Sequence, residues 1–400
     1  MSGFLFVVPP LVGHINPAVG VAAELAARGH RVAWACPDPG LVARLAEPDA
    51  EVFGCAGPVP GADGAQRPAG LRGPEALKFL WEWYLVPLAE AMAPGVRAAV
   101  ESARPEVVVA DQQAFAGALV AERLGVPWAT SATTSAELVD PLAGLPRVKE
   151  HLHGLLADLR LRIGDPSGTA DPRFSPRLAL AFSTPELVGP KGALKGDQLR
   201  YVGPSIAARP TAPGFPWQWL DSGRPTVLVT LGTANTDVGG RFLDVCLEAM
   251  REQADRVQTV IADPGGALGA DGGTAPGQED KDVLIVPSVP QPALLERVDA
   301  VVCHAGHNTV CEALWHGLPL VVAPIRDDQP VVAGQVVDAG AGVRIRFGRV
   351  SATRLGAAVD EVLHEPGFRA AAGRIRTAFR AAGGAPAAAT HLEHLARESR

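Results

Sequence analysis

The residues whose types and spacing most clearly predict chemistry lie at positions 304–329, in the sequence HAGHNTVCEALWHGLPLVVAPIRDDQ. A buried strand ends at His304, Gly306 permits a tight turn, and Asn308 with Thr309 can begin a helix. The free N–H groups and the positive dipole end of such a helix suit an anion. A diphosphate therefore fits this part of the stretch.

An Asp-Gln pair closes the same stretch. Asp328 and Gln329 follow a second buried strand and begin a new helix, where a carboxylate beside an amide can hydrogen-bond vicinal sugar hydroxyls. His304 can donate to a diphosphate oxygen, and the Thr309 hydroxyl can add a contact. Glu312 is placed one helical turn further on to accept both ribose hydroxyls. The stretch therefore predicts a bound nucleotide-sugar.

Structural interpretations of these residues stay open. His304 and His307 can cap a turn, and Asp327 or Asp328 can cap the helix that follows. The two histidines are also a possible metal pair, but no third ligand lies at a spacing typical of zinc.

Buried strands and helices must position these side chains. In the N-terminal half, the runs 4–8, 31–36 and 107–111 have the apolar pattern of buried strands. Helices are predicted from Pro17 to Arg28 and over about residues 114–124. Strands that are apolar on both faces and alternate with helices are typical of a parallel sheet covered on both sides.

The C-terminal half repeats this architecture, with strands predicted at 226–232, 258–263, 283–289, 300–306, 318–325 and 343–347. We predict an acceptor-binding domain at residues 1–205, a Pro- and Gly-rich linker at 206–222 and a nucleotide-sugar-binding domain at 223–380. A C-terminal helix, 381–400, is expected to pack back on the first domain. The fold class is α/β, with two doubly wound, Rossmann-like sheets facing a central cleft.

Composition limits the functional classes. The chain has 400 residues, is 47% hydrophobic and 20% charged, and carries a formal net charge of -7. That charge argues against a nucleic-acid or anionic-membrane surface. No segment approaches the ~18–20 apolar residues of a membrane span, and the start does not resemble a signal peptide. Reduced thiols in the cytoplasm are expected for the five cysteines, Cys36, Cys55, Cys246, Cys303 and Cys311.

Three motifs of the C-terminal half resemble one family. They are VPQ at 289–291, H-x-G-x-N-T at 304–309 followed by Glu312, and the pair Asp328-Gln329. In order and nearly in spacing they resemble the donor-binding signature of the family-1 glycosyltransferases, the UDP-glycosyltransferase superfamily with the GT-B fold. The likeness is greatest to bacterial macrolide, polyketide and carotenoid glycosyltransferases, and it covers nearly the whole chain.

The resemblance implies a set of donor contacts. His304 and Thr309 would contact the diphosphate, Glu312 the ribose, and Asp328 with Gln329 the transferred sugar. The loop of TLGT (230–233), which ends at Thr233, would approach the donor phosphates. The remaining members of the implied donor set are Val289, Gln291, Gly306 and Asn308.

One departure from the family pattern concerns the nucleobase of the donor. Many members place an aromatic residue two positions before the VPQ proline to stack on the base, and this chain has Ser288 there. The donor therefore stays open between UDP-glucose and a dTDP-deoxyhexose, with Asp328 and Gln329 favouring a fully hydroxylated hexose.

The resemblance also predicts a catalytic base in the N-terminal half. The segment PPLVGHINP places His14 in a turn at the carboxyl edge of the first strand, and family members with a similar GH-x-x-P segment use their His to deprotonate the acceptor. Asp111 would hold one ring nitrogen and stabilise the imidazolium. The alternative is that His14 caps a turn and Asp111 caps a helix.

The acceptor is the part that the sequence defines least. The segment KFLWEWYLVPLAEAM (78–92) is aromatic and helix-like. It is typical of a packed amphipathic helix, and the alternative is that Phe79, Trp83 and Leu88 line an apolar acceptor pocket. A lipophilic small molecule such as a polyketide or macrolide is expected on that second interpretation.

No metal or other cofactor is expected. The DKD triplet at 280–282 resembles the Asp-x-Asp that holds a divalent ion in the other large glycosyltransferase fold, but it lies in a polar Gly-rich loop and is expected to be solvated. The helix dipole and His304 can neutralise the leaving diphosphate instead.

The predicted function is an inverting glycosyltransferase, which would turn an α-linked donor into a β-glycoside. The alternatives are a nucleotide-sugar epimerase of the same fold and a non-catalytic nucleotide-sugar-binding subunit; a homodimer stays open. A nicotinamide oxidoreductase is disfavoured because no G-x-G-x-x-G follows the first strand.

Overall fold

A computed structural model of the chain describes residues 1–47, 49–59, 71, 73–190, 196–206, 214–232, 238–269 and 281–398. The chain divides into two compact units. Unit 1 comprises Met1–Ala207 with Ala381–Arg400, and unit 2 comprises Ala208–Arg380.

Unit 1 is built on a parallel sheet. Within its described residues the sheet has seven strands in the order β3-β2-β1-β4-β5-β6-β7. Because β1 has β2 on one side and β4 on the other, the winding direction reverses between β1 and β4. The strands are β1 Gly3–Val7, β2 Arg31–Cys36, β3 Glu51–Gly54, β4 Val107–Asp111, β5 Trp128–Ala132, β6 Ala179–Ala181 and β7 Leu199–Tyr201.

Helices cover both faces of this sheet, as the apolar strands predict. Along β1, Phe4 and Phe6 point to one face, and Leu5 and Val7 point to the other. The first face packs against α1 and the C-terminal helix α14, and the second packs against α4, α5 and α6. The helices of unit 1 are α1 Val12–Ala27, α2 Pro39–Leu45, α3 Gly73–Phe79, α4 Val86–Ala103, α5 Phe115–Leu124, α6 Pro146–Ile163, α7 Pro185–Val188 and α14 Gly384–Glu398.

Helix α1 begins earlier than the sequence predicts. Its first residue is Val12, so that Pro17 lies inside the helix and His14 lies in its first turn instead of in a turn before it. Pro17 removes one backbone donor and is expected to cost helix stability. The apolar residues of α1, such as Ile15 and Val21, are fully buried against the sheet. This packing outweighs the local cost, which explains why the pattern alone misplaced the start.

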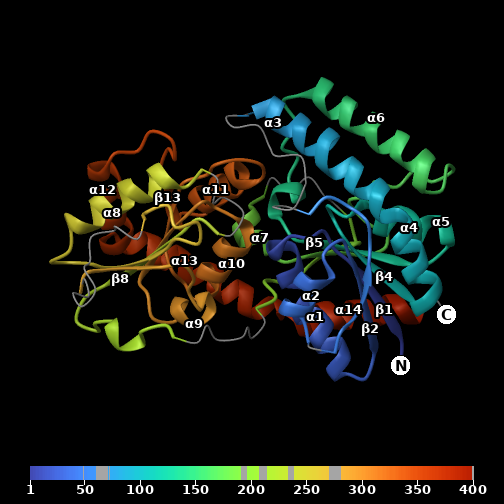
Figure 1. The fold of residues 1–400 in the computed structure, drawn as a ribbon, viewed down its shortest axis with the longest axis horizontal. Helices are drawn as coiled ribbons and strands as arrows, with labels where there is room; N and C mark the ends of the chain where they lie inside the picture. Colours follow the sequence, from blue (N-terminus) through green and yellow to red (C-terminus); the bar gives the residue numbers. More distant parts are fainter. Residues whose placement is uncertain are drawn as a thin grey trace. The chain divides into compact units, whose positions relative to one another are not determined.

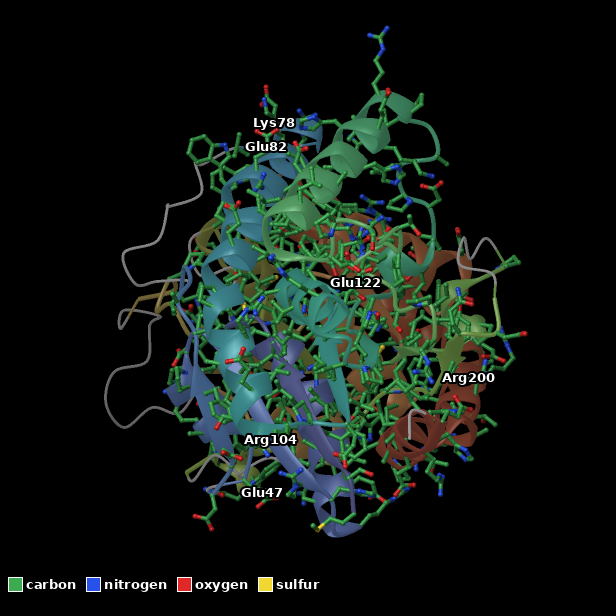
Figure 2. All side chains as sticks on the ribbon, turned by 90° about the vertical axis from the view of Figure 1, so that its right-hand side faces the viewer. Glu47, Lys78, Glu82, Arg104, Glu122 and Arg200 are labelled. Atoms are coloured by element: carbon green, nitrogen blue, oxygen red, sulfur yellow. The ribbon has the colours of Figure 1, made fainter. Side chains whose placement is uncertain are left out.

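A long helical rod forms the most irregular part of unit 1. A π-helical segment, Leu80–Leu85, joins α3 to α4, and α6 runs alongside α4 (Figure 1). Lys78 and Glu82, one turn apart, form an exposed ion pair at the α3 end of this rod (Figure 2). π-Helical turns such as the one at Leu80–Leu85 are often found at functional sites.

Unit 2 repeats the parallel architecture. Within its described residues the sheet has six strands in the order β10-β9-β8-β11-β12-β13, and its winding reverses between β8 and β11. The strands are β8 Thr226–Thr230, β9 Gln258–Ala262, β10 Val283–Val286, β11 Ala300–Cys303, β12 Leu320–Val322 and β13 Gly342–Arg344. All six coincide with strand segments predicted from the sequence.

One face of the second sheet carries the buried side chains of Val227, Val229 and Val302, which pack with residues of α8 and α12. Helices α10 and α11 contact β11 and β13. The helices of unit 2 are α8 Gly240–Arg251, α9 Gln291–Leu295, α10 His307–Trp315, α11 Gln329–Asp338, α12 Ala352–His364 and α13 Pro366–Ala382, the last of which runs into the boundary with unit 1.

The predicted fold class is confirmed: two doubly wound parallel sheets with helices on their faces. Ligands of such sheets bind beyond the carboxyl ends of the strands, where the strand order reverses. Those two points follow β1 and β4 in unit 1, and β8 and β11 in unit 2. In the described part of the chain, no helix combines the length and the apolar character that crossing a bilayer requires.

Candidate functional site

His14 and Asp111 meet at the reversal point of unit 1. His14 comes from the first turn of α1, which follows β1, and Asp111 is the last residue of β4. The Nδ1 atom of His14 lies 3.0 Å from each carboxylate oxygen of Asp111. The structure therefore brings the two predicted catalytic residues into direct contact.

Thr133 completes this polar cluster. Its hydroxyl donates to Asp111 Oδ2 at 2.9 Å, and its Oγ1 lies 2.8 Å from His14 Nδ1. The backbone N–H of Gln113 donates to Asp111 Oδ1 at 2.8 Å. The carboxylate is thus held from three sides.

His14 and Asp111 differ in how far their side chains are buried. The Asp111 side chain has no exposed surface, whereas the side chain of His14 is 16% exposed. A carboxylate only accepts hydrogen bonds, so the Nδ1 of His14 must carry the hydrogen. The basic nitrogen of the neutral ring is then Nε2. This is the tautomer that an aspartate imposes on a histidine that acts as a base.

Two polar side chains close to this cluster have unsatisfied atoms. Gln112 is 1% exposed, and neither its amide oxygen nor its amide nitrogen has a hydrogen-bond partner among the described residues. The hydroxyl of Tyr84, in the π-helical segment, is also buried without a partner there. Burial, together with the charges of Cys36 and Asp111, raises the pKa of Tyr84. A buried polar group without a partner costs about 1–3 kcal/mol.

In unit 2, His304 and its neighbours form a tight loop after β11. Ala305 has φ 66°, a conformation that costs a residue with a side chain about 1–3 kcal/mol. A Cβ atom placed on Gly306 would lie 2.4 Å from His304 Nε2, and one placed on Gly232 would lie 2.9 Å from the same ring. Glycine is therefore required at both positions if the His304 ring is to occupy its place.

Burial makes His304 electrically neutral near pH 7. The residue is 8% exposed, and burial lowers its pKa from the ordinary 6.5 to about 4, while a backbone hydrogen bond with Thr230 opposes the shift. Its Nδ1 atom has no partner in the described part of the chain. The ring can thus serve a ligand as a neutral hydrogen-bonding group.

The N-terminus of α10 follows directly. Gly306 is the residue before the helix and has no side chain to cap the first-turn N–H groups. Asn308 and Thr309 lie in that first turn, and Thr309 is 7% exposed. His307 instead packs along the helix, with its Nε2 3.4 Å from the sulfur of Cys311.

Three of the predicted donor residues form one hydrogen-bonded group. The amide nitrogen of Gln291 donates to Glu312 Oε2 at 2.7 Å, and that of Asn308 donates to Glu312 Oε1 at 2.8 Å. Glu312 is 1% exposed, and these amides give each of its buried carboxylate oxygens a hydrogen-bond donor. The carbonyl of Val289 accepts from the N–H of Gln291 at 2.8 Å and so fixes the start of α9.

Asp328 and Gln329 lie at the start of α11. Asp328 precedes the helix, but its side chain makes no capping hydrogen bond. The Gln329 amide oxygen accepts from the backbone N–H groups of Ile325 and Arg326, at 2.9 and 3.1 Å. Asp327, with φ 57°, is a second strained residue and directly precedes the predicted donor contact Asp328.

The remaining predicted residues differ in placement. Thr233 lies outside the described residues. Leu88 is fully buried in the core of unit 1, Phe79 is partly buried, and Trp83 is 64% exposed. Asp282 of the DKD triplet pairs with Arg224 at 2.6 Å, and the first Asp of the triplet lies outside the described residues. The roles predicted for all the donor, catalytic and acceptor residues stay predictions.

Thr133 and Gln112 were not among the site residues predicted from the sequence. A signal for Thr133 was present, because it directly follows β5, the strand beside β4, at the same carboxyl edge as Asp111. Gln112 directly follows Asp111. Polar residues that follow neighbouring parallel strands lie at the same edge of the sheet and can therefore form one site.

Two doubly wound sheets with polar clusters at their reversal points define the class of GT-B glycosyltransferases. The solved structure of the glycotransferase of kitacinnamycin superposes with a TM-score of 0.78 at 28% identity, covering 98% of each chain. The predicted GT-B fold is therefore confirmed.

The family follows from the sequence comparisons. The model of the family described as UDP-glucoronosyl and UDP-glucosyl transferase matches residues 246–380. A 4'-demethylrebeccamycin synthase of Lentzea aerocolonigenes is 33% identical, over 92% of this chain and 93% of its own length. A demethyllactenocin mycarosyltransferase of Streptomyces fradiae is 32% identical, over 99% of this chain and 87% of its own. The chain belongs to this family and is a glycosyltransferase of the antibiotic and natural-product type.

Proposed function

We propose that this enzyme is an inverting glycosyltransferase that moves a hexose from a UDP- or dTDP-sugar to a hydroxyl of a lipophilic small molecule. In this proposal, unit 1 supplies the base and unit 2 holds the donor. The observation that carries it is the contact of His14 Nδ1 with both oxygens of the buried Asp111 carboxylate at 3.0 Å.

The proposed step is a single displacement. His14 Nε2 takes the proton of the acceptor hydroxyl while the acceptor oxygen forms a bond to the anomeric carbon. The bond from that carbon to the diphosphate oxygen breaks, and the nucleoside diphosphate leaves with the electron pair. Asp111 stabilises the imidazolium that forms, and Thr133 keeps the carboxylate in place. A positioned base of this kind contributes ~10²–10⁴-fold in rate.

The donor contacts of the proposal follow from unit 2. The diphosphate would lie at the uncapped first turn of α10, within reach of His304 and Thr309. The Glu312 carboxylate, which the amides of Gln291 and Asn308 hold in place, would accept the ribose hydroxyls. Asp328 and the amide nitrogen of Gln329 would bind sugar hydroxyls, because the amide oxygen of Gln329 is already engaged.

We propose that the acceptor contacts both apolar side chains and buried polar groups of unit 1. The unsatisfied amide of Gln112 and hydroxyl of Tyr84 are suited to an oxygen-bearing group of the acceptor. The names of the two relatives refer to natural products, which supports a natural-product acceptor. Phe79 and Trp83 are the exposed or partly exposed apolar residues of the acceptor set.

We also propose that the reaction needs no metal ion. The N-terminal dipole of α10 would stabilise the charge on the leaving diphosphate. Activity after treatment with a chelator is then expected to equal that of the untreated enzyme. A loss that added Mg²⁺ or Mn²⁺ restores would overturn this part of the proposal.

The test is incubation with a panel of UDP- and dTDP-hexoses and apolar alcohol or phenol acceptors, with products detected by mass spectrometry. Proton NMR of the purified glycoside then gives the anomeric configuration. An α-linked donor is expected to give a β-glycoside. Retention of the α configuration would exclude the proposed displacement, and conversion of the donor without an acceptor would favour an epimerase.

A further inference from the structure

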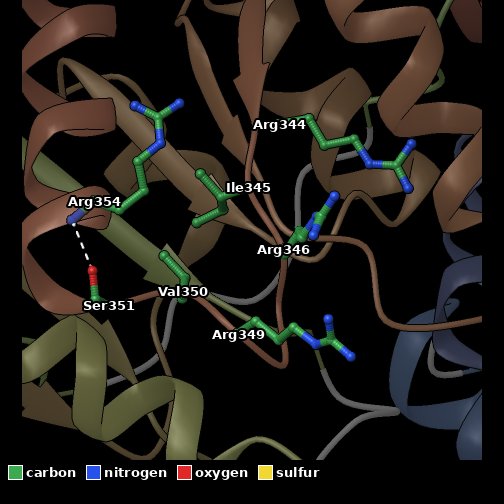
Figure 3. Close-up of a pocket in the computed structure, with 7 residues that line it drawn as sticks. All are labelled: Arg344, Ile345, Arg346, Arg349, Val350, Ser351 and Arg354. Carbon is green, nitrogen blue, oxygen red and sulfur yellow. Dashed lines mark hydrogen bonds between the residues drawn. The ribbon is translucent and has the colours of Figure 1, made fainter.

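Four arginines line a pocket of unit 2 that none of the donor contacts uses. The pocket has a volume of about 300 Å³ and includes Arg344, Arg346, Arg349 and Arg354 (Figure 3). This volume is at the lower end of the range for small-molecule sites. It is suited to a small ligand and not to a protein helix, which is about 10–12 Å across with its side chains.

The backbone of this segment is fixed by burial and hydrogen bonds. Ile345 and Val350, 4% and 5% exposed, hold it to the core. The N–H of Ile345 donates to the Val322 carbonyl of β12 at 2.9 Å, and the N–H of Val350 donates to the Arg346 carbonyl at 2.9 Å. Exposed guanidinium groups are thus attached to a well-anchored turn.

The turn is held from a neighbouring helix as well. Arg241 of α8 donates to the carbonyl of Gly348. Ser351 then caps α12, accepting from the N–H of Arg354 at 3.3 Å. The first turn of α12, a helix of 13 residues, contains no acidic residue, so its positive dipole end adds to the charge of the arginines.

The charge of the pocket is not compensated from within. In the described part of the chain, none of its four guanidinium groups forms an ion pair or a hydrogen bond with a carboxylate. Arg224, Arg256 and Arg369 of the same unit each pair with an aspartate. The chain as a whole carries a charge of -7, so this concentration of positive charge is a local feature.

The arrangement of the side chains favours one class of ligand. Arg344, Arg346 and Arg349 extend to the same side of Ile345, and Arg354 extends to the other side (Figure 3). Guanidinium forks bind phosphate and carboxylate oxygens in pairs, and neighbouring forks suit an anion with several oxygens.

We propose that this pocket binds a phosphate group of a small molecule, at a site built from different residues from those proposed for the sugar donor. The inference does not depend on the proposed transfer reaction. Two sources share this chemistry: a free phosphate or diphosphate ion, and a phosphate ester carried by a larger metabolite.

The test is a titration of the full-length protein with inorganic diphosphate and, separately, with a hexose phosphate, by isothermal calorimetry. No UDP is added, because its diphosphate could occupy the pocket itself, and Arg346→Gln distinguishes this pocket from a donor site. Arg346→Gln is expected to weaken binding about tenfold, because it removes one charge-assisted contact. Arg346→Lys keeps the charge but loses the planar guanidinium group. Its affinity for the probes is expected to lie between that of Arg346→Gln and that of the wild type.

Arg374→Gln is the matched control, because Arg374 is an exposed arginine of α13 outside the pocket. It is expected to bind both probes like the wild type, and circular dichroism checks that each variant is folded. Binding of diphosphate alone would identify a free ion as the ligand, and binding of the hexose phosphate alone would identify an ester. No binding of either probe, or equal weakening by Arg346→Gln and Arg374→Gln, would overturn the proposal.

Discussion

The polar clusters at the two reversal points differ in how far their groups are satisfied. In unit 1, His14, Asp111 and Thr133 bond to one another, and the Asp111 carboxylate is held from three sides. In unit 2, the Nδ1 atom of His304 has no partner among the described residues, and Gly306 gives α10 no capping side chain. His14, Asp111 and Thr133 thus satisfy one another without a ligand, although Gln112 and Tyr84 close to them are unsatisfied, whereas the His304 ring itself lacks a partner on Nδ1 among the described residues.

Strained backbone conformations also differ between the two units. Three described residues other than glycine have a positive φ, and two of them, Ala305 and Asp327, adjoin predicted donor contacts in unit 2. The third, Arg104, ends helix α4. Strained conformations and unsatisfied polar atoms persist where something else compensates for them. The difference supports the proposal that unit 1 holds a preformed base, whereas unit 2 holds a site that its ligand completes.

The largest effect is expected from Asp111→Asn. An amide in place of the carboxylate changes the tautomer that His14 adopts and removes the charge that stabilises its protonated form. We expect kcat to fall about 10²–10⁴-fold, with little change in the donor KM. Steady-state kinetics on an acceptor found by the panel gives both values. A loss of less than fivefold would show that the base does not depend on Asp111.

Gly306→Ala is expected to damage unit 2 through its fold. The new Cβ would lie 2.4 Å from His304 Nε2, so the ring or the loop must move. We expect a loss of about 1–3 kcal/mol in the free energy of unfolding, measured with urea, and weaker donor binding. Gly334→Ala in α11 is the control: its Cβ meets nothing within 4 Å, and alanine is expected to stabilise that helix by about 0.5–1 kcal/mol. If both variants had the same free energy of unfolding, the packing of His304 against Gly306 would not contribute to stability.

His304 predicts a pH dependence of stability. Its folded pKa, about 4, lies below the ordinary 6.5, so the unfolded chain binds the proton more readily between these values. Its contribution to the free energy of unfolding is therefore full above pH 6.5. It falls by at most about 1.4 kcal/mol per pH unit as the pH is lowered through about 4.

Urea unfolding of the wild type and of His304→Gln at pH 7.0 and 5.0 measures this contribution. The stability difference between the two pH values is expected to be smaller in the variant. An identical difference in both proteins would mean that His304 titrates as an exposed histidine does.

The smallest effect is expected from Thr133→Val. The variant removes one hydrogen bond to Asp111 but leaves the contact between His14 and Asp111, so we expect kcat to fall about three- to tenfold. Thr133→Ser, which retains the hydroxyl, is expected to keep most of the activity. If valine and serine had the same effect, the hydroxyl would not be the group that matters.

Local sequence patterns predicted much of this architecture. Fully apolar runs such as 226–230 and 300–303 identified the strands, and the family resemblance predicted the pair His14 and Asp111, which the structure brings into contact. Because parallel strands share a carboxyl edge, residues that follow β1 and end β4 can lie together.

Features that depend on tertiary packing were not accessible in this way. The start of α1 at Val12 depends on burial of its apolar face, and the positive φ of Ala305 depends on the neighbouring loop. The amide of Gln291 reaches Glu312 only once α9 and α10 are packed together, whereas Asn308 bonds Glu312 within α10. The segment at 80–85 reads as an ordinary helix, although its hydrogen bonding is of the π type.

The most direct test of a preformed base in unit 1 and a donor site in unit 2 compares His14→Ala with His304→Ala. Single-turnover rates at saturating donor and calorimetric affinities for UDP and dTDP are measured for both variants and the wild type. We predict that His14→Ala loses at least about 10²-fold in rate with unchanged nucleotide affinity, and that His304→Ala binds nucleotide more weakly. A His14→Ala enzyme that transfers the sugar at the wild-type rate would contradict this account.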